Sequence, residues 1–253
     1  MTTDLTSPYS CVLAVDTATA LQSIALIDGD EILESRLRRV AFNHGSSLLA
    51  NIDSLFEDRC IGLQDVDLFA VGLGPGSFTG LRVGLATAKA LSRSVDTPIV
   101  GVSSLAAQAY LPARHRPGHP VASLFDARRR EVYGGVYQWD DEQLNCLLED
   151  CALAPDTWME HVDASVDGPL LQVGDALQRY DQLLQWSRPE LLTLGPEFIS
   201  PSALGVAYLG RHRATRRGSA DRAQLEPNYI RPSDAVLPDR QPTAMPAKPE
   251  SDR

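Results

Sequence analysis

A pattern of strands that occurs twice most constrains what this chain can fold into. The stretch "SCVLAVDTA" is an apolar strand that ends near Asp16, and residues 22–37 supply two further strands joined by an Asp-Gly-Asp turn. The stretch "PVASLFDA" is a similar strand that ends near Asp126, and residues 130–151 again supply two strands. Helices and further apolar strands follow in both halves. The sequence therefore predicts an α/β protein of two lobes, formed by duplication of one unit.

The boundaries of the lobes follow from the same pattern. We expect a first lobe at residues 9–107 and a second at 108–236, with a linker near 105–120. A last helix, at about 201–217, is expected to pack back on the first lobe. Residues 237–253 are rich in proline and charge, so the sequence predicts a disordered tail.

Composition and charge limit the classes of partner. The apolar fraction of 43% is ordinary for a globular protein, and the formal charge of −10 opposes direct binding of nucleic acid phosphates. The arginine-rich run at 211–217 is interpreted as the solvated end of a helix, with an RNA contact as the less favoured alternative. Neither a membrane span nor a signal-peptide pattern is present. Four cysteines without CxxC spacing fit a reducing compartment, so we expect a cytoplasmic protein.

The loop that opens "GPGSFTGLRVGLATAKAL" allows two interpretations. Gly74 and Gly76 permit a tight turn, and Ser77 is placed as a helix N-cap, where free backbone N–H groups suit an anion. The alternative is a well-capped turn without a ligand, since neither a P-loop lysine nor a dinucleotide fingerprint is present. In a duplicated fold, Asp16, this loop and Asp126 would all point into the cleft between the lobes. These aspartates could hold Mg²⁺ at a nucleotide, but no glycine-rich loop wraps a phosphate, and no cofactor is predicted.

The helix behind this loop carries small residues at helical spacing. Gly80, Gly84, Thr87, Ala88 and Leu91 form one stripe, although glycine inside a helix costs about 0.8–1.0 kcal/mol relative to alanine. Close approach of another element would offset that cost. The element is either the protein's own sheet or a helix of another subunit. In the second case the apolar face of an earlier helix at 44–59 would join it, and a homologous partner would complete a four-helix bundle.

Catalytic and metal-binding patterns are weak. His115 and His119 have ligand-like spacing, but Pro117 and Gly118 separate them, so we interpret them as exposed loop residues. No GxSxG elbow is present, and no Cys or Ser has a histidine at suggestive spacing. The residues alone therefore predict neither a catalytic residue nor a metal site.

Six motifs occur in an order and spacing that resemble the bacterial TsaB (YeaZ) family. They are "LAVDTATALQSIALIDG", "AVGLGPGSFTGLRVGLATAKAL", "PIVGVSSLAAQA", "DARRREVYGGVY", "LQVGDAL" and "EPNYIRPSDA". The resemblance spans roughly residues 11–236, and the GPGSFTGLR block followed by DARRxEVY is highly specific. Two departures concern the loop and the interface: Leu73 stands where the family usually has arginine, and "GSS" follows His44 in place of a serine-acid pair.

The resemblance implies an actin-like (ASKHA, RNase H-like) fold and a role in making N6-threonylcarbamoyladenosine at position 37 of tRNA. It implies a non-catalytic subunit that pairs with the catalytic TsaD-type transferase, joins a TsaE-type ATPase, and contacts tRNA indirectly through the complex. Where the transferase carries two metal-binding histidines after the matching strand, this chain has Ser104 and Gln108. The alternatives are an actin-like small-molecule phosphotransferase and, more remotely, a metallopeptidase.

The resemblance also places the partner surface on the first two helices, at about 44–59 and 77–94. We expect the same helices to support a homodimer when the partner is absent. The predicted partner surface consists of Leu48, Leu49, Ile52, Leu55, Phe56, Phe78, Gly80, Leu81, Gly84, Thr87, Ala88 and Leu91.

Overall fold

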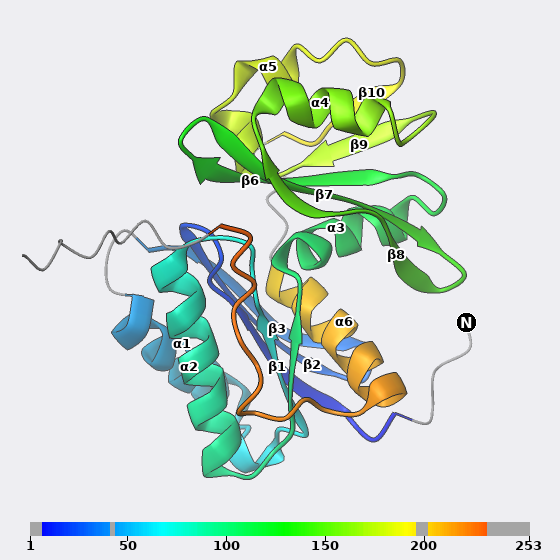
Figure 1. Cartoon of the computed structure of the whole chain (residues 1–253). Coiled ribbons are helices and arrows are strands. Elements are labelled where there is room, and N and C mark those ends of the chain that lie inside the picture. Colours follow the sequence, from blue (N-terminus) through cyan, green and yellow to red (C-terminus); the bar gives the residue numbers. More distant parts are fainter. Residues whose placement is uncertain (1–6, 41–43, 196–201, 232–253) are drawn as a thin grey trace, which may run out of the picture.

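Two five-stranded sheets, one in each lobe, form the framework of the protein (Figure 1). The structure, a computed structural model, describes residues 7–40, 44–195 and 202–231 of the 253-residue chain. The predicted tail at 237–253 lies outside the described residues. In the described part, no helix is both long enough and apolar enough to cross a membrane.

The first sheet contains an antiparallel meander followed by two parallel strands, in the order β3-β2-β1-β4-β5. Its elements are β1 (Cys11–Asp16), β2 (Leu21–Asp28), β3 (Glu31–Arg39), α1 (His44–Arg59), a 3₁₀ turn η1 (Leu63–Asp65), β4 (Leu68–Gly72), α2 (Phe78–Ser94), β5 (Ile99–Val102) and α3 (Ser104–His115).

The second sheet repeats this order, because β8-β7-β6-β9-β10 corresponds strand by strand to β3-β2-β1-β4-β5. The β6–β7–β8 pairs are antiparallel, whereas β6–β9 and β9–β10 are parallel. The repeat confirms the predicted α/β fold of two similar units. Its elements are β6 (Val121–Arg128), β7 (Glu131–Asp140), β8 (Gln143–Leu153), α4 (Pro155–Asp163), β9 (Leu170–Val173), η2 (Asp175–Gln178), α5 (Asp181–Leu184), β10 (Leu191–Thr193) and α6 (Ser202–Arg217).

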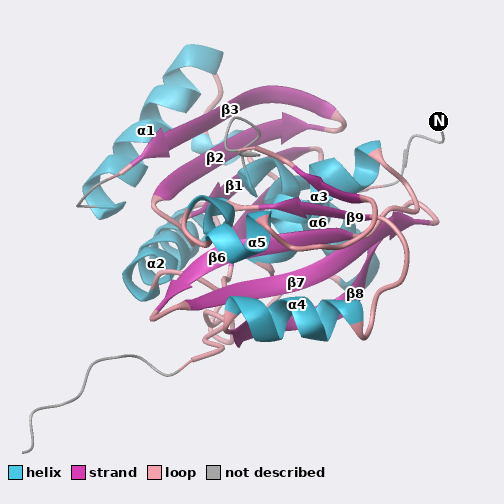
Figure 2. Cartoon of the chain, turned by 90° about the horizontal axis from the view of Figure 1, so that it is seen from above, coloured by secondary structure: helices cyan, strands magenta, loops and turns pink. Residues whose placement is uncertain are grey.

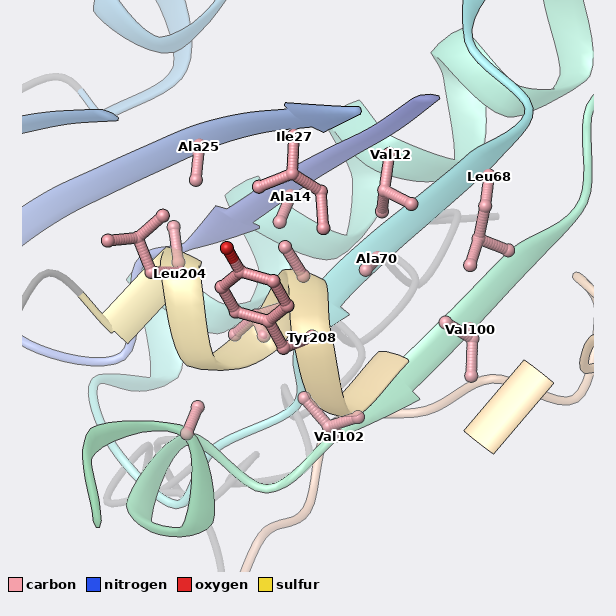
Figure 3. Close-up of a cluster of buried hydrophobic side chains, with 14 of the residues drawn as sticks. Val12, Ala14, Ala25, Ile27, Leu68, Ala70, Val100, Val102, Leu204 and Tyr208 are labelled. Carbon is pink, nitrogen blue, oxygen red and sulfur yellow. The ribbon is translucent and has the colours of Figure 1, made fainter. Parts of the chain in front are cut away.

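On the central strands of each sheet, successive side chains point to two faces that are both covered. On β1, Leu13 and Val15 pack with α1 and α2, whereas Val12 and Ala14 pack with α6 (Figure 3). The expected return of the last helix to the first lobe is therefore present in the structure. The second sheet packs against α4 and α5 on its outer face and against α3 on its inner face (Figure 2).

Two local predictions differ from the structure. The linker predicted near 105–120 is wrong for most of its length, because α3 continues through Pro112 to His115. Ala109 and Ala113, on either side of that proline, are fully buried against the second sheet, and this packing holds the helix across it. The helix predicted near 176–187 is instead two short turns, η2 and α5.

Candidate functional site

The loop before α2 is shaped by contacts inside the first lobe. Ser77 is the N-cap of α2, as predicted, and its hydroxyl accepts a hydrogen bond from the Gly80 N–H at 3.3 Å. The Ser77 N–H donates to the Ala18 carbonyl at 2.7 Å. A Cβ at Gly76 would lie only 2.2 Å from the same carbonyl oxygen. Glycine is therefore required here so that two backbone segments can touch, whether or not a ligand is present.

A cavity of about 430 Å³ lies between the lobes, and it is lined by this loop and by the loops that follow β6 and β9. Its size falls in the range of sites for small ligands. Of the predicted cleft residues, Gly76, Ser77 and Asp126 line it. The other residues in its wall are Ala18, Thr19, Ala20, Val40, Phe78, Thr79, Phe125, Ala127, Arg128, Tyr133, Asp175, Asn228, Tyr229, Ile230 and Arg231.

Asp16 and Gly74 do not line this cavity, which corrects the prediction that they face the cleft together with Asp126. Asp16 is 2% exposed, and its Oδ1 accepts hydrogen bonds from the Ala18 N–H at 2.9 Å and the Ser104 hydroxyl at 3.2 Å. The residue borders a separate small cavity of about 20 Å³, which Ser202 also lines. Burial raises the pKa of the Asp16 carboxyl above its usual range. Gly74 is buried against the Leu81 side chain.

Asp126 has a different environment at the cavity wall. Its Oδ1 accepts hydrogen bonds from the Tyr180 hydroxyl and the Arg128 N–H, both at 2.8 Å, and its Oδ2 lies 3.4 Å from the Arg179 guanidinium. Burial, followed by the hydrogen bond to Asp126, raises the pKa of Tyr180 to about 12. The Asp126 N–H in turn donates to Asp175 at 2.9 Å. These contacts occupy the carboxylate with the protein's own groups.

Ser104 and Gln108 occupy the positions at which the resemblance implies metal-binding histidines in the transferase, and neither side chain suits a metal here. The Ser104 hydroxyl is fully buried between Asp16 and the Gly74 N–H, which donates to it at 3.1 Å. Gln108 is 5% exposed, and its Oε1 accepts from the Ser123 hydroxyl at 2.9 Å. Both side chains are neutral and already hydrogen-bonded. In the described part of the chain, no three His, Cys, Asp or Glu side chains gather in a geometry that could hold a metal ion.

The glycine stripe of α2 contacts the chain's own β1–β2 loop. A Cβ at Gly80 would lie 2.1 Å from the Thr17 carbonyl oxygen, and a Cβ at Gly84 would lie 2.3 Å from the Thr17 hydroxyl oxygen. The Thr17 hydroxyl also donates to the Gly80 carbonyl at 2.7 Å. The interpretation in which these glycines admit a helix of another subunit is therefore wrong. Their small size is needed by the protein's own fold.

Most of the predicted partner residues are likewise part of the first lobe's core. On α1, Leu48, Ile52, Leu55 and Phe56 are buried beneath the sheet, whereas Leu49 is 46% exposed. On α2, Leu81 and Ala88 are buried, whereas Phe78, Thr87 and Leu91 are half-buried. Of the predicted partner residues, those that are at least partly exposed are Leu49, Phe78, Thr87 and Leu91.

A segment at 225–231 joins the lobes, and no role was predicted for it. The Asn228 N–H donates to the Leu73 carbonyl of the first lobe at 2.7 Å. Arg231 donates to the Ala127 carbonyl of the second lobe at 2.8 Å and forms an ion pair with Glu131. The motif "EPNYIRPSDA" was the available signal, but only the fold shows that it crosses from one lobe to the other.

The same segment completes an aromatic cluster at the mouth of the cavity. Tyr229 packs on Phe78 with ring centroids 5.0 Å apart, and its hydroxyl accepts from the Arg82 Nε at 3.0 Å. The Arg82 guanidinium carbon lies 3.7 Å from the centre of the Phe78 ring. The N-terminal end of α2 is thus held to the C-terminal part of the chain.

Comparisons with known proteins place the chain among its relatives. The profile of the family "TsaD: tRNA N6-adenosine threonylcarbamoyltransferase" matches residues 38–180, which is more than half of the chain. The "tRNA threonylcarbamoyladenosine biosynthesis protein TsaB" of Bacillus subtilis (strain 168) is 32% identical over 227 residues, covering 88% of this chain and 95% of that protein. The protein of the same name from Escherichia coli (strain K12) is 31% identical, covering 87% and 94%.

Solved structures agree with this placement. The structure described as "YeaZ from Pseudomonas aeruginosa" has a TM-score of 0.73 and 26% identity, covering 87% of this chain and 99% of that one. Component A of the Acidaminococcus fermentans (R)-2-hydroxyglutaryl-CoA dehydratase has a TM-score of 0.51 at 13% identity, covering 81% and 99%, which shows a shared fold alone. The fold is actin-like, as expected. The chain therefore belongs to the TsaB family of tRNA threonylcarbamoyladenosine biosynthesis proteins.

Proposed function

We propose that this chain is the non-catalytic subunit of a cytoplasmic complex that makes N6-threonylcarbamoyladenosine at position 37 of tRNA. In this proposal it pairs with a TsaD-type transferase, joins a TsaE-type ATPase, and needs no cofactor of its own. Family membership supports the pathway. The observation that carries the non-catalytic role is the pair Ser104 and Gln108, which are neutral, buried and hydrogen-bonded where the transferase has metal ligands.

The partner surface in this proposal is the outer face of α1 and α2. Of the residues predicted for it, this face keeps Leu49, Phe78, Thr87 and Leu91. This face differs from the glycine stripe, which the first lobe uses internally. Ala86 and Ala90 are exposed on α2, so a partner helix can approach its backbone there. We propose that the same face pairs two copies of the chain when the transferase is absent.

The alternative is a small-molecule phosphotransferase of the actin-like fold. The cavity of about 430 Å³ between the lobes, with Asp126 in its wall, favours it. Two features count against it. Asp16 is outside that cavity. Gly76, in the loop before α2, is glycine because the Ala18 carbonyl leaves no room for a Cβ, so a phosphate is not needed to explain it. This alternative predicts ATP turnover by the chain alone.

Reconstitution of tRNA threonylcarbamoylation tests the proposal. The transferase, the ATPase, threonylcarbamoyl-AMP and tRNA are mixed with or without this chain, and modified adenosine is measured. We expect product only in the complete mixture and none from this chain alone. Product that is unchanged when the chain is omitted would refute the proposal. ATP hydrolysis by the purified chain, abolished by Asp126→Asn, would favour the phosphotransferase.

A variant pair tests the partner surface. Ala86→Arg places a large charged side chain on the exposed face of α2, and we expect loss of co-elution with the transferase. Arg38→Gln, on β3 outside the two helices, is the control and should leave co-elution unchanged. Normal co-elution of Ala86→Arg would place the partner surface elsewhere.

A further inference from the structure

The C-terminal ends of α3 and α6 bring two basic segments of the sequence together. Residues 104–119 and 202–217 contain arginine and histidine but neither aspartate nor glutamate, in a chain whose formal charge is −10. We define the α3–α6 basic surface by the six arginines of these segments. They are Arg114, Arg116, Arg211, Arg213, Arg216 and Arg217.

The two helices pack against each other, and the guanidinium carbons of Arg114 on α3 and Arg211 on α6 each lie 5.8 Å from the centre of the Tyr208 ring (Figure 1). A Cβ at Gly205 would lie 1.9 Å from the Ala107 carbonyl oxygen, one turn before Tyr208 stacks on Tyr110 with centroids 5.5 Å apart. One turn further, the Arg114 guanidinium carbon lies 5.8 Å from the centre of the Tyr208 ring. Because residues later in α3 contact residues at the same or a later position in α6, the two helices run in the same general sense.

Aromatic rings hold Arg114 without neutralising it. Its guanidinium carbon lies 5.9 Å from the centres of both the Tyr110 and the Trp139 rings, in addition to Tyr208. It donates one hydrogen bond, to the Tyr110 hydroxyl at 2.9 Å. Contacts with aromatic faces orient a guanidinium while most of its N–H groups stay available.

Two further arginines of the surface donate hydrogen bonds to neutral groups. Arg213 donates to the Gly101 carbonyl at 2.8 Å, and Arg216 donates to the Gln143 Oε1 at 3.2 Å. Within residues 7–40, 44–195 and 202–231, an ion pair is found for Arg211, whose partner is Asp30 at 2.6 Å, and for none of the other five. Asp141 and Glu142 in the β7–β8 turn lie next to Gln143 in sequence and bound the surface.

The macrodipole at a helix C-terminus is offset by about half a positive charge, which a single cation supplies. Five arginines that have no acidic partner within the described residues exceed that need. Their planar guanidinium groups match the oxygens of phosphodiesters. We propose that the α3–α6 basic surface binds the phosphate backbone of the tRNA substrate, an inference that rests on the proposed function. The net charge of −10 keeps this contact weak in the isolated chain, and it acts when the transferase presents the tRNA.

A matched pair of double variants tests this surface. Arg216→Gln with Arg217→Gln removes two adjacent charges from it, and Arg38→Gln with Arg39→Gln removes two adjacent exposed charges from β3. Binding of a tRNA transcript is measured by fluorescence anisotropy between 50 and 200 mM salt. Both the full chain alone and its complex with the transferase are titrated.

We expect the Arg216/Arg217 variant of the complex to bind tRNA about tenfold more weakly, with a salt slope smaller by about 2. Substitution of the same two positions by lysine should restore most of the affinity, and the β3 variant should match the wild type. Unchanged affinity and slope in the Arg216/Arg217 variant would overturn the inference. The inference would also be overturned if the Arg216/Arg217 variant kept its affinity for tRNA but lost binding to anionic lipid vesicles that the wild type binds. That result would assign the surface to a membrane.

Failure of the inference is distinguishable from failure of the proposed function. If the complex forms and modifies tRNA but the Arg216/Arg217 variant binds normally, only the RNA surface is refuted. If no complex forms, the proposed function is refuted, and titration of the chain alone at 50 mM salt decides the inference. Equal tRNA binding by the wild-type chain and its Arg216/Arg217 variant in that titration counts against it.

Discussion

The two lobes share one order of strands but differ at the end of their first strand and after their fourth. In the first lobe Asp16, the last residue of β1, is enclosed, and a 17-residue helix, α2, follows β4. In the second lobe Asp126, near the end of β6, lines the cavity, and the short η2 and α5 follow β9. The two sheets thus agree in strand order, whereas the groups at the ends of corresponding strands differ. The two lobes therefore present different groups to the space between them, although their sheets have the same order of strands.

The largest effect that tests this comparison is expected at Gly80. Gly80→Leu would push a side chain against the Thr17 carbonyl, a backbone atom that cannot move away. We expect the free energy of unfolding to fall by about 3 kcal/mol, since overpacking of a filled core has this order of cost. Urea unfolding followed by circular dichroism measures it.

Ala86→Leu on the exposed face of the same helix is the matched control. Its free energy of unfolding should stay within about 0.5 kcal/mol of the wild type. If Gly80→Leu were as stable as this control, α2 would not pack on the β1–β2 loop. The first lobe would then not be closed by internal contacts between α2 and the β1–β2 loop, and its contrast with the second lobe, in which Asp126 lines the cavity, would not hold.

Periodicity made much of the fold predictable. Strands with continuous apolar runs, the helix at 44–59, the Ser77 cap and the repeat of units depend on local spacing, which the sequence displays directly. Asp16 and Asp126 were rightly placed at corresponding strand ends. Their different environments depend on which loops cover them, and that is decided by residues far apart in sequence, such as Ser104 and Tyr180.

The glycine stripe shows where local reasoning could not decide. Spacing indicates that Gly80 and Gly84 meet something closely, but Thr17 and an outside helix satisfy the same pattern. The cavity wall at 228–231 was equally inaccessible, because that segment follows the whole second lobe in sequence and then returns to Leu73. The spacing of small residues indicates that a close contact exists, but the topology of the chain determines which element makes it.

The second prediction compares the two aspartates through pH. Because burial raises the pKa of Asp16, the native state holds this proton more tightly than the unfolded chain. The stability it contributes is full below the unfolded pKa of about 4 and is lost as the pH rises through the higher folded pKa. Asp16→Asn keeps the Oδ1 acceptor and removes the charge. We expect it to raise the free energy of unfolding at pH 7 by about 2 kcal/mol, with little change at pH 3.

Asp126→Asn is the control for that experiment, since Asp126 has hydrogen bonds and a nearby arginine. Denaturant titrations of both variants from pH 3 to pH 8 make the comparison. A loss of stability in Asp16→Asn at pH 7 would contradict the prediction. It would show that the buried Asp16 carboxylate is charged at pH 7 and is stabilised by a neighbouring group.

A smaller effect is expected from the helix caps that follow β4 and β9. Ser77 accepts a hydrogen bond from Gly80, whereas Gly174, at the corresponding position before η2, has no side chain to offer. Ser77→Ala should lower the free energy of unfolding by about 1 kcal/mol, and Ser77→Gly by only a few tenths. Equal losses for alanine and glycine would mean that the hydroxyl does not cap α2.

The smallest expected effect concerns the ion pair on the open side of the cavity. The Arg179 side chain is 63% exposed and lies 3.4 Å from the Asp126 carboxylate, so solvent and salt screen the pair. Arg179→Gln should change the free energy of unfolding by less than about 0.5 kcal/mol, and the difference should vanish in 1 M NaCl. A larger, salt-resistant loss would mean that the Asp126 carboxylate is as enclosed as that of Asp16. The asymmetry between the lobes would then reside in α2 alone, not in the two aspartates.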